Sequence, residues 1–274
     1  MTITPISDPD DPRIAPYRDI RERDLTGRQG LFLAEGGVVL RVLASAASRC
    51  RVRSVLLAEN RVEGLSDVLA GLPAETPVHV APQPVLDAIA GFPLHRGILA
   101  LGERPASPPL EEVLASAGPG DVFLAACGVG NHDNMGGLFR NAAAFGARAV
   151  LLDDRCCDPF YRKAIRVSVG AVLRQPFVEG MREDVLVERL LEAGVEVLAL
   201  TPSAGERLVD VRPEGPTAVL LGSEGPGLSR RLIGRCRPVG IPMAGGFDSL
   251  NVAATGAVAL HHLKMRAAGE SAAR

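Results

Sequence analysis

The chain has 274 residues, of which 47% are hydrophobic and 23% charged, a balance typical of globular and not of disordered proteins. Its formal net charge of −2 excludes a generally basic nucleic-acid binder, so any polyanion must be held by a local patch. No apolar run approaches the ~20 residues that span a membrane, and the acidic, proline-rich N-terminus resembles no targeting peptide. The cysteines form no C-x-x-C pair, which predicts reduced thiols in a cytoplasmic protein: Cys50, Cys127, Cys156, Cys157 and Cys236.

Residues 1–16 are predicted to be a flexible arm, and residues 17–28 a polar, solvated helix. From Leu31 onward, short apolar runs alternate with helical patterns, which predicts a small α/β sandwich over residues 17–104. The predicted strands cover 31–36, 52–59, 77–81 and 97–103, and the predicted helices cover 37–48, 62–72 and 84–92. The proline-rich stretch 105–120 is predicted to be a linker.

A second alternating series occupies residues 121–268, before a tail at 269–274. Its strands are almost wholly apolar, as in a parallel sheet with helices on both faces. The predicted strands cover 121–128, 147–154, 195–200, 217–222 and 237–242, and a short run at 175–178 is a possible sixth. The predicted helices cover 134–146, 159–171, 182–194, 228–235 and 250–266.

Three glycine-rich loops, at residues 128–137, 222–227 and 244–250, each follow a predicted strand. In an open α/β sheet the carboxyl ends of the strands border one crevice, so these loops are expected to form a ligand site. Neither G-x-G-x-x-G after a first strand nor G-x-x-x-x-G-K-[ST] is present, which argues against dinucleotide and P-loop binding.

Polar residues in these loops have two readings. Asn134 either caps a helix or acts in a site. Asp248 or Ser249 is a candidate cap of the last helix, with Asn251 pointing back from its first turn. Arg140 lies on the face of its helix opposite the apolar stripe of Leu138, Ala142 and Phe145, where a solvated arginine is also tolerated. The residue types alone decide neither case.

Three ordered motifs resemble the SpoU (TrmH) RNA ribose 2′-O-methyltransferases of the SPOUT class. They are N-x-G-x-x-x-R-x-A-x-x-F-G at 134–146, L-G-x-E-G-x-G-L at 221–228, and I-P-M-x-G-x-x-x-S-L-N-V at 241–252. The segment RVSVGAVLRQPF at 166–177 is similar to a further family segment, and the N-terminal half is similar to the family's substrate-binding domain. Ala253 departs from the serine that usually ends the third motif.

The resemblance implies an α/β fold with a C-terminal trefoil knot, a homodimer, and S-adenosylmethionine as cofactor, with no metal. The catalytic positions that it implies are Asn134, Arg140, Glu224, Ser249 and Asn251. The cofactor-binding positions that it implies are Leu200, Thr201, Gly222, Glu224, Gly225, Ile241, Met243, Leu250 and Asn251.

The implied reaction methylates a ribose 2′-hydroxyl of rRNA or tRNA. Arg140 is expected to stabilise the developing alkoxide or a phosphate, since a guanidinium is not deprotonated in proteins. Asn134 is expected to position Arg140 or the ribose, and Glu224 to orient the arginine or the substrate. The alternatives are a knotted base-methylating enzyme and a non-catalytic RNA-binding or ribosome-assembly protein. RNA is expected to contact arginines at 18–28 and 49–53.

Overall fold

The computed structural model describes residues 3–18, 30–91, 94–245 and 249–272, without the side chains of 266–272. Contacts divide the chain into two compact units. Unit 1 consists of Met1–Ala106 with Pro159–Arg174, and unit 2 of Ser107–Asp158 with Gln175–Arg274. None of the helices in the described ranges combines the length and hydropathy that a membrane span requires.

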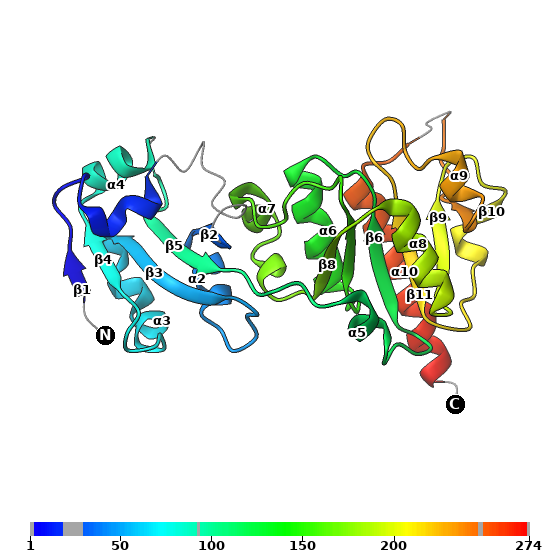
Figure 1. Ribbon diagram of the computed structural model, residues 1–274, viewed down its shortest axis with the longest axis horizontal. Helices are drawn as coiled ribbons and strands as arrows, with labels where there is room; N and C mark the ends of the chain where they lie inside the picture. Colours follow the sequence, from blue (N-terminus) through cyan, green and yellow to red (C-terminus); the bar gives the residue numbers. More distant parts are fainter. Residues whose placement is uncertain (1–2, 19–29, 92–93, 246–248, 273–274) are drawn as a thin grey trace. The chain divides into compact units, whose positions relative to one another are not determined.

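Unit 1 is built on a five-stranded mixed sheet in the order β1-β4-β3-β5-β2 (Figure 1). Strand β5 runs antiparallel to both of its neighbours, and the other pairs are parallel. The strands are β1 (Ile3–Pro5), β2 (Leu31–Glu35), β3 (Arg51–Ala58), β4 (Val78–Ala81) and β5 (Ile98–Glu103). The helices are η1 (Pro12–Tyr17), α2 (Gly37–Leu43), η2 (Glu59–Arg61), η3 (Glu63–Leu65), α3 (Ser66–Ala70), α4 (Gln83–Ala90), α7 (Arg162–Val167) and η4 (Ala171–Leu173).

The expectation of a flexible arm is wrong for the described part of residues 1–16. Strand β1 pairs with β4, and Ile6, Ile14 and Tyr17 are buried in the core against β3 and α4. The Tyr17 hydroxyl also hydrogen-bonds the Ser54 hydroxyl at 2.6 Å. Three large apolar side chains spaced along a polar segment bury enough surface to dock it. Of the predicted helix at 17–28, residues 19–28 lie outside the described ranges.

The segment Pro159–Arg174, expected in the domain 121–268, belongs to unit 1. Phe160 packs on Phe32 with 4.9 Å between ring centroids. Arg162 forms an ion pair of 2.6 Å with Glu35, whose side chain is 8% exposed. A buried carboxylate needs a cationic partner, and this segment supplies it. The domain boundaries predicted from sequence order are corrected accordingly.

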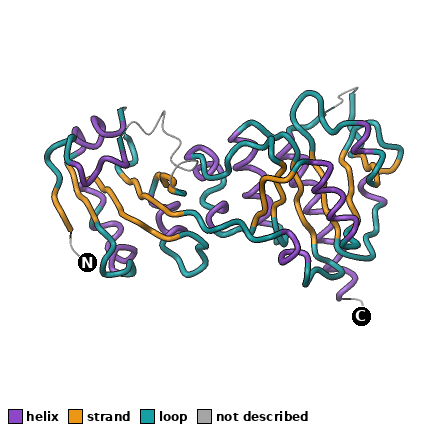
Figure 2. Tube along the Cα trace, in the orientation of Figure 1, coloured by secondary structure: helices purple, strands orange, loops and turns teal. Residues whose placement is uncertain are grey.

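Unit 2 contains a seven-stranded parallel sheet in the order β10-β12-β9-β11-β6-β7-β8 (Figures 1 and 2). The five predicted strands and the sixth candidate are present, and the two-residue β10 is an addition. The strands are β6 (Val122–Ala126), β7 (Val150–Asp153), β8 (Phe177–Met181), β9 (Glu196–Leu200), β10 (Glu206–Arg207), β11 (Thr217–Leu221) and β12 (Arg237–Gly240). The helices are α5 (Leu110–Leu114), α6 (His132–Ala144), α8 (Glu183–Glu192), η5 (Leu208–Asp210), α9 (Arg230–Ile233) and α10 (Val252–Ala272).

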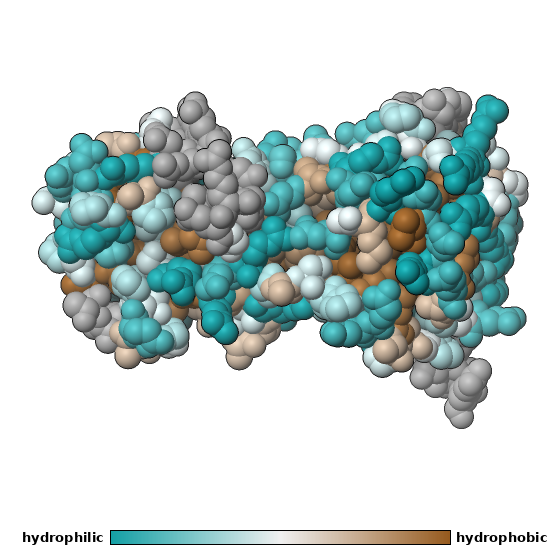
Figure 3. All heavy atoms as spheres, in the orientation of Figure 1, coloured by the Kyte–Doolittle hydropathy of each residue, from teal (hydrophilic) through white to brown (hydrophobic). Residues whose placement is uncertain are grey.

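Helices cover both faces of this sheet, because successive strand residues point to opposite sides. On one face, Phe123 and Ala125 of β6 share a buried cluster with α5, α8 and α9. The cluster includes Leu110, so the predicted linker 105–120 contributes a core residue to unit 2 and is not a free connection. Helices α6 and α10 pack together and cover the other face. In the view of Figure 3, hydrophilic residues cover most of the surface and hydrophobic residues show in patches between them.

Helices α6 and α10 approach closely at two glycines. A Cβ on Gly137 would lie 2.7 Å from the Cβ of Ala253, and one on Gly256 would lie 3.0 Å from Leu138. The Nδ2 of Asn141 donates to the backbone oxygen of Ala253 at 2.7 Å. This contact fixes the start of α10 against the second half of α6.

Candidate active site

A cleft of about 770 Å³ lies at the carboxyl ends of β9, β11 and β12. Its lining combines apolar and polar side chains, as small-molecule sites do. The residues that line it are Leu200, Thr201, Pro202, Leu221, Gly222, Ser223, Glu224, Gly225, Pro226, Gly227, Leu228, Ile241, Met243, Ser249, Leu250, Asn251, Val252 and Thr255. All of the expected cofactor-binding positions therefore lie on one cleft.

The loop after β11 is folded tightly onto itself. The backbone N–H of Gly227 donates to the Ser223 oxygen at 3.1 Å. A Cβ on Gly222 would lie 2.5 Å from the carbonyl carbon of Gly227 and from the nitrogen of Leu228. Such a distance is incompatible with any side chain, so only glycine fits at the point where the strand opens into the cleft.

Three side chains at the cleft form a hydrogen-bonded series that we call the amide relay: Asn251, Asn134 and Glu224. The Oδ1 of Asn251 accepts from the backbone N–H groups of Ala253 (2.9 Å) and Ala254 (3.2 Å), as in a helix cap. Its Nδ2 donates to Oδ1 of Asn134 at 2.8 Å, and the Nδ2 of Asn134 donates to Oε1 of Glu224.

The direction of every bond in the amide relay follows from its first one. Backbone N–H groups can only donate, so the oxygen of Asn251 must face them and its amide nitrogen must face Asn134. The oxygen of Asn134 is then an acceptor, and its nitrogen is left to donate to Glu224. The start of α10 thus orients the Asn134 amide, which donates to the Glu224 carboxylate. This bond holds the carboxylate in place on an exposed glycine loop.

The capping interpretation of Asn134 is wrong. Asn131 caps α6, its side chain accepting from the backbone N–H of Asp133 at 2.7 Å. Asn134 lies in the first turn of α6 and is 6% exposed, and its side-chain amide hydrogen-bonds Asn251 and Glu224. Ser249 lines the cleft, Asn251 caps α10, and Asp248 lies outside the described residues.

Arg140 does not line this cleft. It is exposed on α6, and within the described ranges its guanidinium makes no hydrogen bond or ion pair. Asn134 binds Glu224 and not Arg140, so the expectation that Asn134 positions the arginine has no support in the arrangement. Its predicted exposure on the face opposite Leu138 is confirmed, since Leu138 is fully buried.

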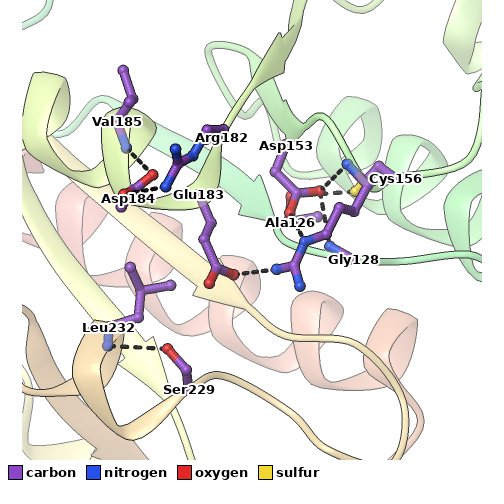
Figure 4. A network of polar contacts seen from close by, with 11 residues as sticks. Ala126, Gly128, Asp153, Cys156, Arg182, Glu183, Asp184, Val185, Ser229 and Leu232 are labelled. Carbon is purple, nitrogen blue, oxygen red and sulfur yellow. Dashed lines mark hydrogen bonds and ion pairs between the residues drawn. The ribbon is translucent and has the colours of Figure 1, made fainter.

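A second polar network holds the first glycine loop in place (Figure 4). The fully buried side chain of Asp153, at the end of β7, accepts from the backbone N–H of Gly128 at 2.9 Å. Arg155 donates to the same carboxylate at 3.3 Å and pairs with Glu183. Gly128 in turn lies against Ser223 of the cleft loop. Sequence reasoning missed Asp153, although a carboxylate that ends a wholly apolar strand was the available signal.

Cys127, Asp153 and Glu183 lie close enough for their ligand atoms to surround a small cation. Arg155 already neutralises both carboxylates, however. Burial also raises the pKa of the Cys127 thiol well above its ordinary value, and a thiol binds metals as the thiolate. The expectation of no metal stays a prediction.

Comparisons with known proteins find relatives along nearly the whole chain. The model of the SpoU rRNA Methylase family matches residues 121–261. An uncharacterized tRNA/rRNA methyltransferase of Mycobacterium bovis is 37% identical over 272 residues, covering 95% of this chain and 91% of that protein. The AdoMet-bound rRNA methyltransferase from Sinorhizobium meliloti has a TM-score of 0.80 at 22% identity, covering 96% of this chain and 98% of its own.

A further solved structure, an RNA 2′-O ribose methyltransferase, has a TM-score of 0.75 at 26% identity, covering 96% of this chain and 99% of its own. These likenesses confirm the α/β architecture with its parallel-sheet domain. The trefoil knot stays a prediction.

Proposed function

Because this chain belongs to the SpoU rRNA methylase family, we propose that it transfers a methyl group to a ribose 2′-hydroxyl of rRNA or tRNA. Its cofactor is S-adenosylmethionine. The coarser activity, RNA methylation, is supported by the family and by relatives along nearly the whole chain. The finer one, ribose as the acceptor, is supported by the likeness to a 2′-O ribose methyltransferase and by the amide relay.

The cleft fits the cofactor. Its volume of about 770 Å³ suits a nucleoside with an amino-acid tail. Leu200, Ile241 and Met243 offer apolar contacts to the adenine, while the side-chain-free Gly222 exposes backbone amide and carbonyl groups. S-adenosylmethionine supplies an electrophilic methyl group when bound. The chain has to align a hydroxyl with that methyl, and the proton of the hydroxyl passes to solvent water as the methyl ether forms.

The amide relay is the single observation that carries the proposal. One oxygen of Glu224 is occupied by the Asn134 amide, so the other is left to accept a hydrogen bond from the ribose hydroxyl. Because the relay is tied to the backbone of α10, the carboxylate does not have to reorganise when the substrate binds. Preorganised acceptors of this kind align a nucleophile at little entropic cost.

A homodimer is part of the proposal. A hollow of about 730 Å³ over α10 is lined by Leu208, Val209, Ile241, Pro242, Ala257, Val258, His261, His262 and Met265. Val209, Val258 and Met265 are 48%, 44% and 55% exposed, which is unusual for apolar side chains gathered in one place. Ile241 lines both this hollow and the cofactor cleft. A second copy seated here would border the cleft. We further propose that Arg140, which lines neither the hollow nor the cleft of its own chain, acts in the cleft of the partner.

The proposal is tested by incubating the protein with S-adenosylmethionine labelled on the methyl group and with separated rRNA and tRNA fractions. Label in one fraction that survives as an alkali-resistant dinucleotide indicates 2′-O-methylation, since a blocked hydroxyl prevents cleavage. Label released on mononucleotides indicates base methylation instead. RNA binding without any transfer indicates the non-catalytic alternative. Glu224→Gln serves as the control, expected to bind cofactor and transfer little.

A further inference from the structure

One corner of unit 1 gathers five arginines from three separate parts of the chain. Strand β3 begins there, β5 ends there, and the segment Pro159–Arg174 ends beside both. We call it the arginine corner, and its members are Arg49, Arg51, Arg53, Arg104 and Arg174.

Backbone contacts establish that these residues are neighbours. Arg51 lies opposite Glu103 in the antiparallel pair of β3 and β5, and Arg104 follows directly. The backbone N–H of Arg49 donates to the oxygen of Leu173 at 2.8 Å, which places Arg174 next to Arg49. Arg53 sits where the β3–β5 register shifts, and its guanidinium approaches Glu103 at 3.5 Å.

Three of the five cations of the arginine corner have no acidic partner among the described residues. Glu103 offers a loose ion pair to Arg53. Over the ranges that the structure describes, the guanidinium groups of Arg49, Arg51 and Arg174 form no ion pair or hydrogen bond. Arg51 and Arg174 are exposed, and Arg49 is half-buried. Like charges at close range oppose folding, so in a chain of net charge −2 such a cluster is best explained by an anionic ligand.

The chemistry of the cluster suits phosphate groups. Arginine presents a planar fork of donors that binds phosphate oxygens in pairs, and its charge does not depend on pH in the physiological range. Arg104 lies over the ring of Phe160 at 4.9 Å from its centroid, a cation–π contact.

We propose that the arginine corner binds backbone phosphates of the RNA substrate, an inference that rests on the proposed function. This set of arginines differs from the one expected from the sequence, which comprised residues 18–28 and 49–53. Arg18 donates to the backbone oxygens of Pro9 and Asp11, and residues 19–28 lie outside the described ranges. Arg104 and Arg174 join Arg49, Arg51 and Arg53 instead. Arg174 is the last residue of its segment in unit 1 and directly precedes Gln175, where the chain re-enters unit 2.

The test compares two triple variants of the full chain that carry the same change in charge. The first is Arg49→Gln, Arg51→Gln and Arg174→Gln. The control is Arg189→Gln, Arg207→Gln and Arg212→Gln, three exposed arginines of unit 2 of which two pair with local acids. Affinity for a short fluorescein-labelled RNA hairpin is measured by anisotropy over a range of salt concentrations. S-adenosylmethionine binding is measured by calorimetry on the same preparations.

The corner variant is expected to bind RNA about tenfold more weakly at low salt, and to lose roughly 2 from the slope of log affinity against log salt. Its cofactor affinity stays at the wild-type value, and its thermal midpoint does not fall, because like charges have been removed. An RNA affinity equal to that of the control variant overturns the arginine corner and leaves the proposed function standing. A wild-type chain without RNA affinity overturns both. A fall in the thermal midpoint of the corner variant would assign these arginines to the fold and contradict the proposal.

Discussion

The side chain of Asn134 donates a hydrogen bond to the carboxylate of Glu224, although 90 positions separate the two residues. Asn134 is buried in the first turn of α6, and Glu224 stands on an exposed glycine loop after β11. Helix α6 therefore supplies the donor that holds an acceptor on the loop after β11. Asn251 fixes the direction of the bond, because its own oxygen is committed to the backbone of α10.

Reversing the polarity of the amide relay separates its chemical role from its structural one. Asn134→Asp removes the donor and places a second carboxylate against Glu224, so we expect methyl transfer to fall about 100-fold. Cofactor affinity should change little. The double variant Asn134→Asp with Glu224→Gln restores the hydrogen bond and the thermal midpoint, but it lacks the carboxylate and stays inactive. Recovery of activity in the double variant would show that Glu224 acts only as a structural partner of Asn134.

Gly222 is expected to tolerate no side chain. Gly222→Ala forces a methyl group to within 2.5 Å of backbone atoms of the same loop, so the loop must open and the cleft must change shape. We expect S-adenosylmethionine affinity, measured by calorimetry, to fall by at least about tenfold while the fold survives. Gly215→Ala is the matched control, since a Cβ there meets nothing within 4 Å. Equal affinities in the two variants would contradict the assignment of the cleft.

The apolar surface over α10 is expected to be covered by a second copy. Val258→Glu places a charge in it, and light scattering should then report a monomer where the wild-type chain is a dimer. Leu191→Glu on α8 is the control, because Leu191 is similarly exposed at 40% and lies away from this surface. A wild-type monomer, or a Val258 variant that still dimerises, would remove the dimer from the proposal.

The thiols are expected to be inert in the native protein. All five cysteines are free, and burial raises the pKa of Cys156 to about 12 and that of Cys236 to about 11. Alkylation by iodoacetamide at pH 8 should therefore be slow until the protein is unfolded in denaturant. Unfolded thiols ionise near pH 8.5, whereas folded ones stay neutral up to their raised pKa. The free energy of unfolding consequently falls as pH rises from about 8.5 to about 12. Fast alkylation of the native protein, or alkaline stabilisation, would contradict these pKa shifts.

Much of the architecture could be predicted from local pattern. Strands β6, β7, β9 and β11 are buried on both faces. A wholly apolar run of this kind can be predicted to be a strand without knowledge of its neighbours. The glycine loops after β11 and β12 could also be predicted to lie together, because both follow the carboxyl ends of strands and these ends share one edge of a parallel sheet.

The rest depended on contacts between distant residues. Nothing local to Phe160 or Arg162 signals that they complete unit 1, because Phe32 and Glu35 lie more than a hundred positions earlier. The arm was misjudged for a similar reason, since Ile14 and Tyr17 look solvated until β4 and α4 are in place. Whether Asn134 caps α6 or acts in a site could not be decided from the residue type alone, because Asn131 competes for the cap and spacing does not give the direction of a side chain.

The measurement that tests the central claim most directly is mass spectrometry of nucleosides from RNA methylated by the purified protein, with S-adenosylmethionine as the methyl donor. The account predicts one 2′-O-methylnucleoside, absent when the Glu224→Gln variant replaces the wild type. A methyl group on a nucleobase would contradict the assignment of the ribose hydroxyl as acceptor. Full transfer by Glu224→Gln would contradict the role given to the amide relay.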